Sequence, residues 1–116
     1  MQRHSNRRIR RVALAAFQEI NKASPEDKGT FRANWMASVG SIDRSVDLRK
    51  TTEDVAESVS KATAVISRVQ VGDTVYISNS VPYANKLEDG YSPQALAGVV
   101  APVVTRIKNA IASGQL

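Results

Sequence analysis

Helical and strand periodicities alternate along this sequence, and that alternation constrains the fold more than any other feature. Apolar residues recur every three or four positions over 9–23 and again over 55–69, which is the spacing of one helix face. Between these stretches, residues 31–39 alternate apolar with polar side chains, the period of a half-buried strand. We therefore predict an α+β fold in which a small antiparallel sheet packs against two or three helices, one of them a long N-terminal helix.

Capping and turn residues set the expected boundaries of these elements. Thr51 and Asp54 have the spacing of a capping box, and Gly90 fits a helical stop after the turn at Pro82. Residues 42–50 fit either a loop or a short extra strand. The chain has 116 residues, the size of one domain, so we expect residues 1–116 to form a single domain. The expected elements are helices at about 6–23, 52–69 and 99–113, one or two helical turns over 82–90, and strands at 30–39 and 74–78.

Composition argues against most enzyme classes. The chain has no cysteine, and His4 is its one histidine, so thiol catalysis and multi-histidine metal sites are not expected. The common phosphate-binding, dinucleotide, zinc and hydrolase motifs are absent from the sequence. The longest apolar run, 95–104, is too short to span a bilayer. We expect no catalytic residues, no metal, no cofactor and no membrane contact.

The positive charge is concentrated at the N-terminus. The first eleven residues contain five arginines and no acid, whereas the other 105 hold equal numbers of basic and acidic residues, giving a net charge of +5. Such a basic arm fits an anionic protein surface, nucleic acid phosphates or a solvated tail. Arginines at the positive end of a helix dipole also favour fraying, so we expect the 1–11 arm to be mobile unless something anionic holds it. The arginines are Arg3, Arg7, Arg8, Arg10 and Arg11.

Residues 91–98 form an uncharged, partly apolar segment that includes Tyr91, Gln94 and Leu96. Exposed apolar segments often mark protein contacts. The segment either folds back over its own core or forms a subunit interface.

Two motifs give the chain a family resemblance. One runs through Ile77-Ser-Asn, Pro82-Tyr-Ala, Leu87-Glu, Gly90 and Gln94-Ala, and the other is Gly29-Thr-Phe-Arg-Ala-Asn-Trp. With them, over about residues 7–112, the chain resembles the head–tail joining or tail-completion (neck) proteins of tailed bacteriophages. It departs from the family pattern at Tyr91, where the family often has Trp, and at residues 95–96, where it often has Ala-Pro.

The resemblance implies a structural protein of the virion without catalysis. It implies a ring of copies at the head–tail junction or the top of the tail, made in the host bacterial cytoplasm and joining the head connector to the tail. Its partners would be copies of itself and other neck, connector or tail proteins, with possible contact to DNA in the channel. The alternative is a small, non-specific nucleic-acid-binding protein that uses the basic arm.

Ten residues are the candidate subunit or partner interface. The basic arm would meet a connector or tail protein, or DNA, and the turn and loop after β-strand 74–78 would meet the neighbouring subunit. The candidates are Arg3, Arg7, Arg8, Arg10, Arg11, Tyr83, Glu88, Tyr91, Gln94 and Leu96.

Overall fold

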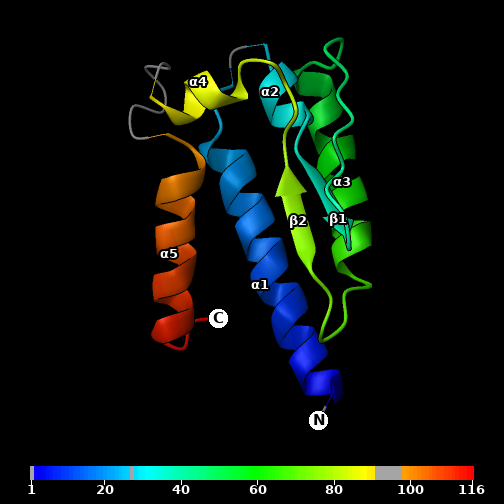
Figure 1. Ribbon diagram of the computed structural model, residues 1–116, viewed down its shortest axis with the longest axis vertical. Helices are drawn as coiled ribbons and strands as arrows, with labels where there is room; N and C mark the ends of the chain where they lie inside the picture. Colours follow the sequence, from blue (N-terminus) through cyan, green and yellow to red (C-terminus); the bar gives the residue numbers. More distant parts are fainter. Residues whose placement is uncertain (1, 27, 91–97) are drawn as a thin grey trace.

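The computed structural model describes residues 2–26, 28–90 and 98–116, with side chains from residue 5 onward. Within these residues the elements follow in the order α1, α2, β1, η1, α3, β2, α4, α5 (Figure 1). A two-stranded antiparallel sheet packs against the helices, and α1 is the longest helix. The predicted α+β class, with a small antiparallel sheet and a long N-terminal helix, is confirmed.

Helix α1 spans Gln2–Ala23 and begins before its predicted start. Two side chains fasten its first turns to the loop that follows α3. The Oδ1 of Asn6 accepts a hydrogen bond from the N–H of Val71 at 2.8 Å, and the Nε of Arg10 donates to the carbonyl oxygen of Val69 at 2.6 Å. These bonds oppose the fraying that arginines at the positive end of the helix dipole would favour.

The predicted strand at 30–39 is wrong in its first half. Thr30–Ala33 form a short helix, α2, and only Met36–Val39 form a strand, β1. Gly29 precedes the helical turn with a φ of 83°, in the left-handed region rather than the extended one. The Nδ2 of Asn34 donates to the carbonyl oxygen of Thr30 at 2.7 Å and holds the other end of the turn.

The burial pattern expected of that segment is nevertheless mostly present. Phe31, Ala33, Trp35 and Ala37 are buried as predicted, whereas Val39 is 41% exposed. One helical turn followed by a strand can bury the same residues as a continuous strand. Period-two alternation over so few residues therefore does not separate the two arrangements.

Strand β2, Val75–Ser78, confirms the strand predicted at 74–78. It pairs with β1 in antiparallel register, with Ala37 opposite Ile77. Ala37 belongs to the hydrophobic core cluster, Ile77 packs against it and α3 contacts β1, so this face of the sheet is directed toward the core.

The remaining helices lie close to their predicted positions. Thr52–Asp54 form a 3-10 turn, η1, which leads into α3 at Val55–Ile66. The N–H of Thr51 donates to Oδ2 of Asp54 at 2.8 Å, as expected of a capping box. Residues 42–50 contain no strand and form a loop. Two further helices follow β2, namely α4 at Ala84–Glu88 and α5 at Val100–Ala112.

One hydrophobic core joins these elements. Phe17 and Ile20 of α1, Trp35 beside β1 and Ile66 of α3 are among its buried members. Helix α5 packs on α1 and contributes Val103, which is fully buried. In Figure 1, α5 lies on one side of α1, and the sheet and α3 lie on the other. Among the described residues, no helix is both long enough and apolar enough to cross a membrane.

Candidate subunit and partner interface

The two sequence motifs, far apart in the chain, meet in the structure. The Nδ2 of Asn79, just after β2, donates to the carbonyl oxygen of Phe31 in α2 at 2.8 Å. The ring of Tyr83 lies 6.4 Å from that of Phe31, which in turn makes an edge-on contact with Trp35 at 5.4 Å between ring centres. The Pro-Tyr-Ala turn therefore packs directly on the Gly-x-x-Arg-x-Asn-Trp segment.

Arg32 fixes the end of α1. Its Nη2 donates to the carbonyl oxygens of Lys22 at 3.0 Å and Ser24 at 2.6 Å, and its Nη1 lies 2.9 Å from Oε1 of Glu26. A cation at the C-terminal end of a helix is favoured by the helix dipole. The arginine of the motif thus joins α2 to the last turn of α1.

Asn34 and Trp35 complete the same junction. The side-chain amide of Asn34 bonds to both backbone groups of Asp47, donating at 3.0 Å and accepting at 2.9 Å. The Nε1 of Trp35 donates to Oγ of Ser24 at 2.7 Å, and that hydroxyl donates to the carbonyl oxygen of Ile20. Both motif residues therefore use their polar groups inside the fold.

Glu88 binds the start of α5 across the segment that precedes it. Its Oε1 accepts the backbone N–H groups of Val99 at 2.9 Å and Val100 at 2.7 Å, and its Oε2 accepts that of Ala101 at 3.0 Å. Burial acts to raise the pKa of the Glu88 carboxyl, but the three backbone donors outweigh it and lower that pKa below its ordinary value. This carboxylate, a candidate interface residue, makes three bonds within its own chain.

The backbone at Gly98 depends on the same residue. Gly98 has a φ of 86°, and a Cβ atom there would collide with the carbonyl oxygen of Glu88. Local sequence rules did not reveal this cap, because Glu88 stands ten residues before Gly98 whereas capping boxes span three. Two sequence features together could have indicated this cap: the acidic residue Glu88 after Leu87, and Gly98 directly before an apolar helix.

Tyr83 is the candidate at the α4 end that remains accessible, with 39% of its surface exposed. Residues Tyr91, Gln94 and Leu96 lie outside the described residues. On α5, Val100 and Val104 are exposed one helical turn apart. This end of the molecule therefore presents an aromatic ring and an apolar helix edge.

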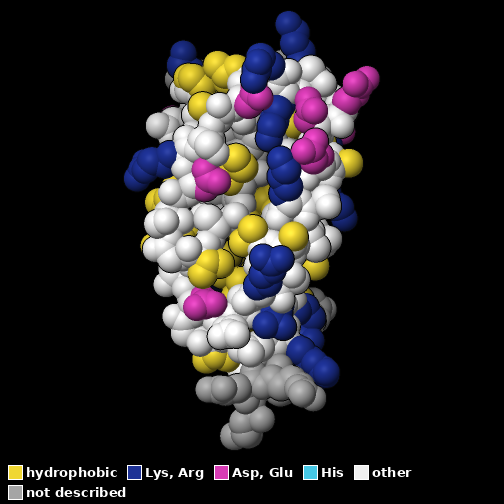
Figure 2. All heavy atoms as spheres, turned by 90° about the vertical axis from the view of Figure 1, so that its right-hand side faces the viewer, with side chains coloured by type: hydrophobic (Ala, Val, Ile, Leu, Met, Phe, Trp, Pro, Cys, Tyr) yellow, Lys and Arg dark blue, Asp and Glu magenta, His cyan; other side chains and the backbone are white. Residues whose placement is uncertain are grey.

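The arginines of α1 do not all point to solvent. Arg7, Arg8 and Arg11 are exposed, while Arg10 is half-buried against the loop that follows α3. The side chain of Arg3 lies outside the described ones. Among the described side chains, no acid forms an ion pair with the three exposed arginines. In Figure 2, Lys and Arg side chains continue down one border of the molecule to the end where α1 begins.

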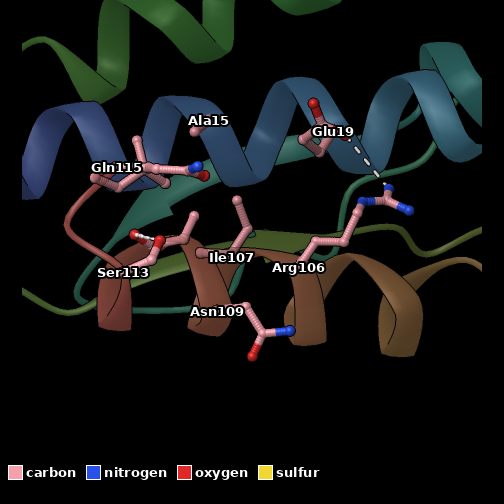
Figure 3. A pocket seen from close by; sticks show the side chains of 9 residues that line it. Ala15, Glu19, Arg106, Ile107, Asn109, Ser113 and Gln115 are labelled. Atoms are coloured by element: carbon pink, nitrogen blue, oxygen red, sulfur yellow. Dashed lines mark hydrogen bonds and ion pairs between the residues drawn. The ribbon is translucent and has the colours of Figure 1, made fainter.

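An open hollow of about 640 Å³ lies between α1 and α5 (Figure 3). Its charged groups are Glu19 and Arg106, which pair across it at 3.3 Å. The other side chains around it are small, apolar or amide groups, including Ala15, Ile107 and Gln115. Within the described part of the chain, no cluster of three metal-ligating side chains occurs. In this hollow, the ion pair between Glu19 and Arg106 therefore connects the two helices.

Comparison with family models, curated proteins and solved structures finds no match to this chain.

Proposed function

We propose that this chain is a structural subunit of a tailed-bacteriophage particle. In this proposal, copies form a ring at the head–tail junction or the top of the tail and join the head connector to the tail. The protein resides in the virion, and its side chains serve as docking surfaces rather than as reagents.

The packing of the two motifs against each other is the observation that carries the proposal. The side chains of Arg32, Asn34 and Asn79 donate hydrogen bonds to backbone carbonyl oxygens of neighbouring segments. Glu88 accepts hydrogen bonds from backbone N–H groups at the start of α5. The polar residues of the two motifs thus hold the elements of the fold together. A structural subunit needs such a scaffold.

The surface is also suited to protein partners. Its exposed apolar side chains lie on separate elements, Val100 and Val104 on α5 and Ile42 and Leu48 in the loop after β1. A head-to-tail ring needs two different patches on each subunit, because each copy contacts its two neighbours through different surfaces. The exposed arginines at the start of α1 supply a third surface, for an anionic partner.

Electron microscopy of assembled particles tests the proposal. Purified protein is incubated with connector-bearing heads or with tail tubes that lack this subunit, and an affinity label on its C-terminus marks its position. We expect a ring of added density at the junction, and labels confined to the neck or the top of the tail. Unlabelled necks on otherwise complete particles would overturn the proposal.

The exposed arginines favour one second candidate, a small non-specific nucleic-acid-binding protein. Its affinity for duplex DNA would fall steeply with salt, with a slope of about −0.9 in log affinity per phosphate contacted. A fluorescence anisotropy titration at several salt concentrations measures this slope. Strong binding by the free protein, together with its absence from particles, would favour this candidate over the first.

A further inference from the structure

An apolar groove of about 440 Å³ is lined by α1, β2 and α5. We call it the edge groove. Its floor and wall carry no acidic group, and Arg8 stands at its rim. The apolar lining comes from Ile9, Val12, Ala13 and Ala16 of α1, from Val75 and Ile77 of β2 and from Ile111 of α5.

The strand beside this groove has an open hydrogen-bonding edge. Gly40 N–H donates to the carbonyl oxygen of Thr74 at 2.9 Å, which makes these two a hydrogen-bonded pair at the end of the β1–β2 ladder. Because such pairs alternate along an antiparallel ladder, the N–H and C=O groups of Val75 and Ile77 point away from β1. Within the described residues, no other hydrogen bond reaches those four groups. The same two residues thus provide apolar side chains for the groove and free backbone groups for a strand.

The dimensions of the edge groove match one short strand. From Arg8 to Ala16, α1 rises about 12 Å at 1.5 Å per residue. About four residues of extended chain cover that length at roughly 3.3 Å per residue. Strand β2 is four residues long. A third strand of this length would cover the apolar floor and pair with β2.

A segment of this chain has the properties that such a strand needs. Residues 42–47, which follow β1 in the chain, are irregular, and the side chains of Ile42 and Val46 in this segment are 44% and 43% exposed. Asn34 engages both backbone groups of Asp47, whereas no hydrogen bond within the described residues reaches the backbone groups of Val46. The segment carries two aspartates and one arginine, a net charge of −1. Asp47 forms an ion pair with Arg49, so Asp43, which forms none among the described residues, is the carboxylate that would face Arg8.

The segment cannot be the third strand of its own sheet. The Oγ of Ser78 donates to the carbonyl oxygen of Asp43 at 2.8 Å, so the segment lies on the sheet face to which Ser78 points. Val75 and Ile77 alternate with Ser78 and point to the opposite face, where the edge groove lies. Donor and acceptor surfaces are therefore different parts of one subunit, as head-to-tail association requires.

We propose that residues 42–47 of one copy add as a third strand to β2 of the next copy and place Ile42 and Val46 in its edge groove. This inference rests on the proposed ring and names the surfaces that would form it. Main-chain bonds to Val75 and Ile77 supply the register, and the apolar pockets between α1 and β2 supply the specificity.

Engineered cysteines test the pairing in the full-length chain, which contains no cysteine of its own. One chain carries Val75→Cys, and a second carries either Val46→Cys or Ile42→Cys. Directly opposed residues on paired strands lie about 5 Å apart, within disulfide range. The matched control is Val71→Cys in the loop after α3, which is 49% exposed, close to the 43% of Val46.

We expect mixed chains to form the Val75–donor disulfide with a yield at least tenfold above the Val75–Val71 control. Equal yields in the two mixtures would overturn the proposal, as would a predominance of Val75→Cys homodimers, which indicate a two-fold contact instead.

Hydrogen exchange gives a second measurement without any substitution. The N–H groups of Val75 and Ile77 should exchange at least tenfold more slowly at about 1 mM protein than at about 10 μM, a range chosen for a weak contact. Exchange that does not depend on concentration would overturn the proposal. Protection that appears only with another virion protein would also overturn it, because the occupant would then not be a second copy.

The outcomes separate this inference from the proposed function. A labelled neck without the Val75–donor disulfide removes the inference and leaves the neck assignment standing. The disulfide in solution, with no label on particles, does the reverse.

Discussion

The carboxylate of Glu88 fixes where the last helix begins. It accepts three backbone N–H groups at the start of α5, and no residue next to that helix in sequence does so among those described. Replacing it by glutamine keeps the shape but removes the charge that these donors and the helix dipole favour. We expect Glu88→Gln to lower the free energy of unfolding by about 1 kcal/mol, the usual value for loss of a helix cap.

Urea unfolding at pH 7 measures this change. Asp89→Asn is the matched control, because Asp89 is exposed and its side chain makes no hydrogen bond among the described residues. An equal loss in both variants would contradict the assigned cap.

The same carboxylate makes stability depend on pH. The pKa of Glu88 is lower in the folded chain than its ordinary value of 4.5, so its contribution is complete above that value. The contribution is lost as pH falls through the folded-state pKa. The difference in unfolding free energy between wild type and Glu88→Gln should therefore shrink below about pH 4.5. Urea titrations between pH 3 and pH 7 measure it, and a difference that stays constant over this range would remove Glu88 as the source.

At the scale of elements, periodicity and capping predicted most helices but misread residues 30–39. The signals for α1, α3 and α5 extend over several turns, so a helical period is distinct there. Over 30–39, one turn of helix and one short strand bury alternate residues just as a single strand does. Two features favour the helical turn: the left-handed backbone of Gly29 and the hydrogen bond from the Asn34 side chain to Thr30. Neither feature changes the periodicity of apolar residues, so the periodicity did not reveal the turn.

The surroundings of the candidate interface residues were predicted less completely than the fold. The exposure of Arg7, Arg8 and Arg11 is as the charge pattern indicates. The bond from Arg10 to the loop that follows α3 and the cap by Glu88 were not predicted, because each joins segments whose separation only the tertiary structure sets. The edge groove was not predicted for the same reason, because it depends on the distance between β2 and α1.

The junction between α2 and η1 allows a paired test at the scale of elements. Gly29 and Gly72 both have a positive φ, but a Cβ at Gly29 would collide with the backbone of Thr52, whereas Gly72 has open space around it. We expect Gly72→Ala to cost about 1–2 kcal/mol for the left-handed backbone alone. Gly29→Ala should cost about 1–3 kcal/mol more, because the junction must also move.

Thermal and urea unfolding of both variants provide the comparison. Equal losses would show that the close approach of residue 29 to Thr52 contributes nothing to stability.

At the scale of the whole molecule, two side chains bond the start of α1 to the rest of the body. Asn6 and Arg10 tie it to the loop after α3, so Arg7, Arg8 and Arg11 are presented on an anchored helix. A rigid display loses less conformational entropy on binding than a mobile tail. Deleting residues 1–11 would remove these anchors together with the charges, so substitution of the exposed arginines is the cleaner test of their role.

We expect the triple change Arg7→Gln, Arg8→Gln and Arg11→Gln to leave the fold intact and to weaken docking onto the connector or tail. Three exposed charge contacts of about 0.5 kcal/mol each amount to roughly a tenfold loss of affinity. The matched control removes the same charge elsewhere, through Lys22→Gln, Lys86→Gln and Lys108→Gln, at exposed positions that make no ion pair among the described residues. Sedimentation binding to isolated connectors and tails, at low and at high salt, measures the affinity of both variants.

The loss of affinity in the arginine variant should diminish as salt rises, since screening already weakens those contacts in the wild type. Equal losses in the two variants would mean that net charge, and not the start of α1, governs docking.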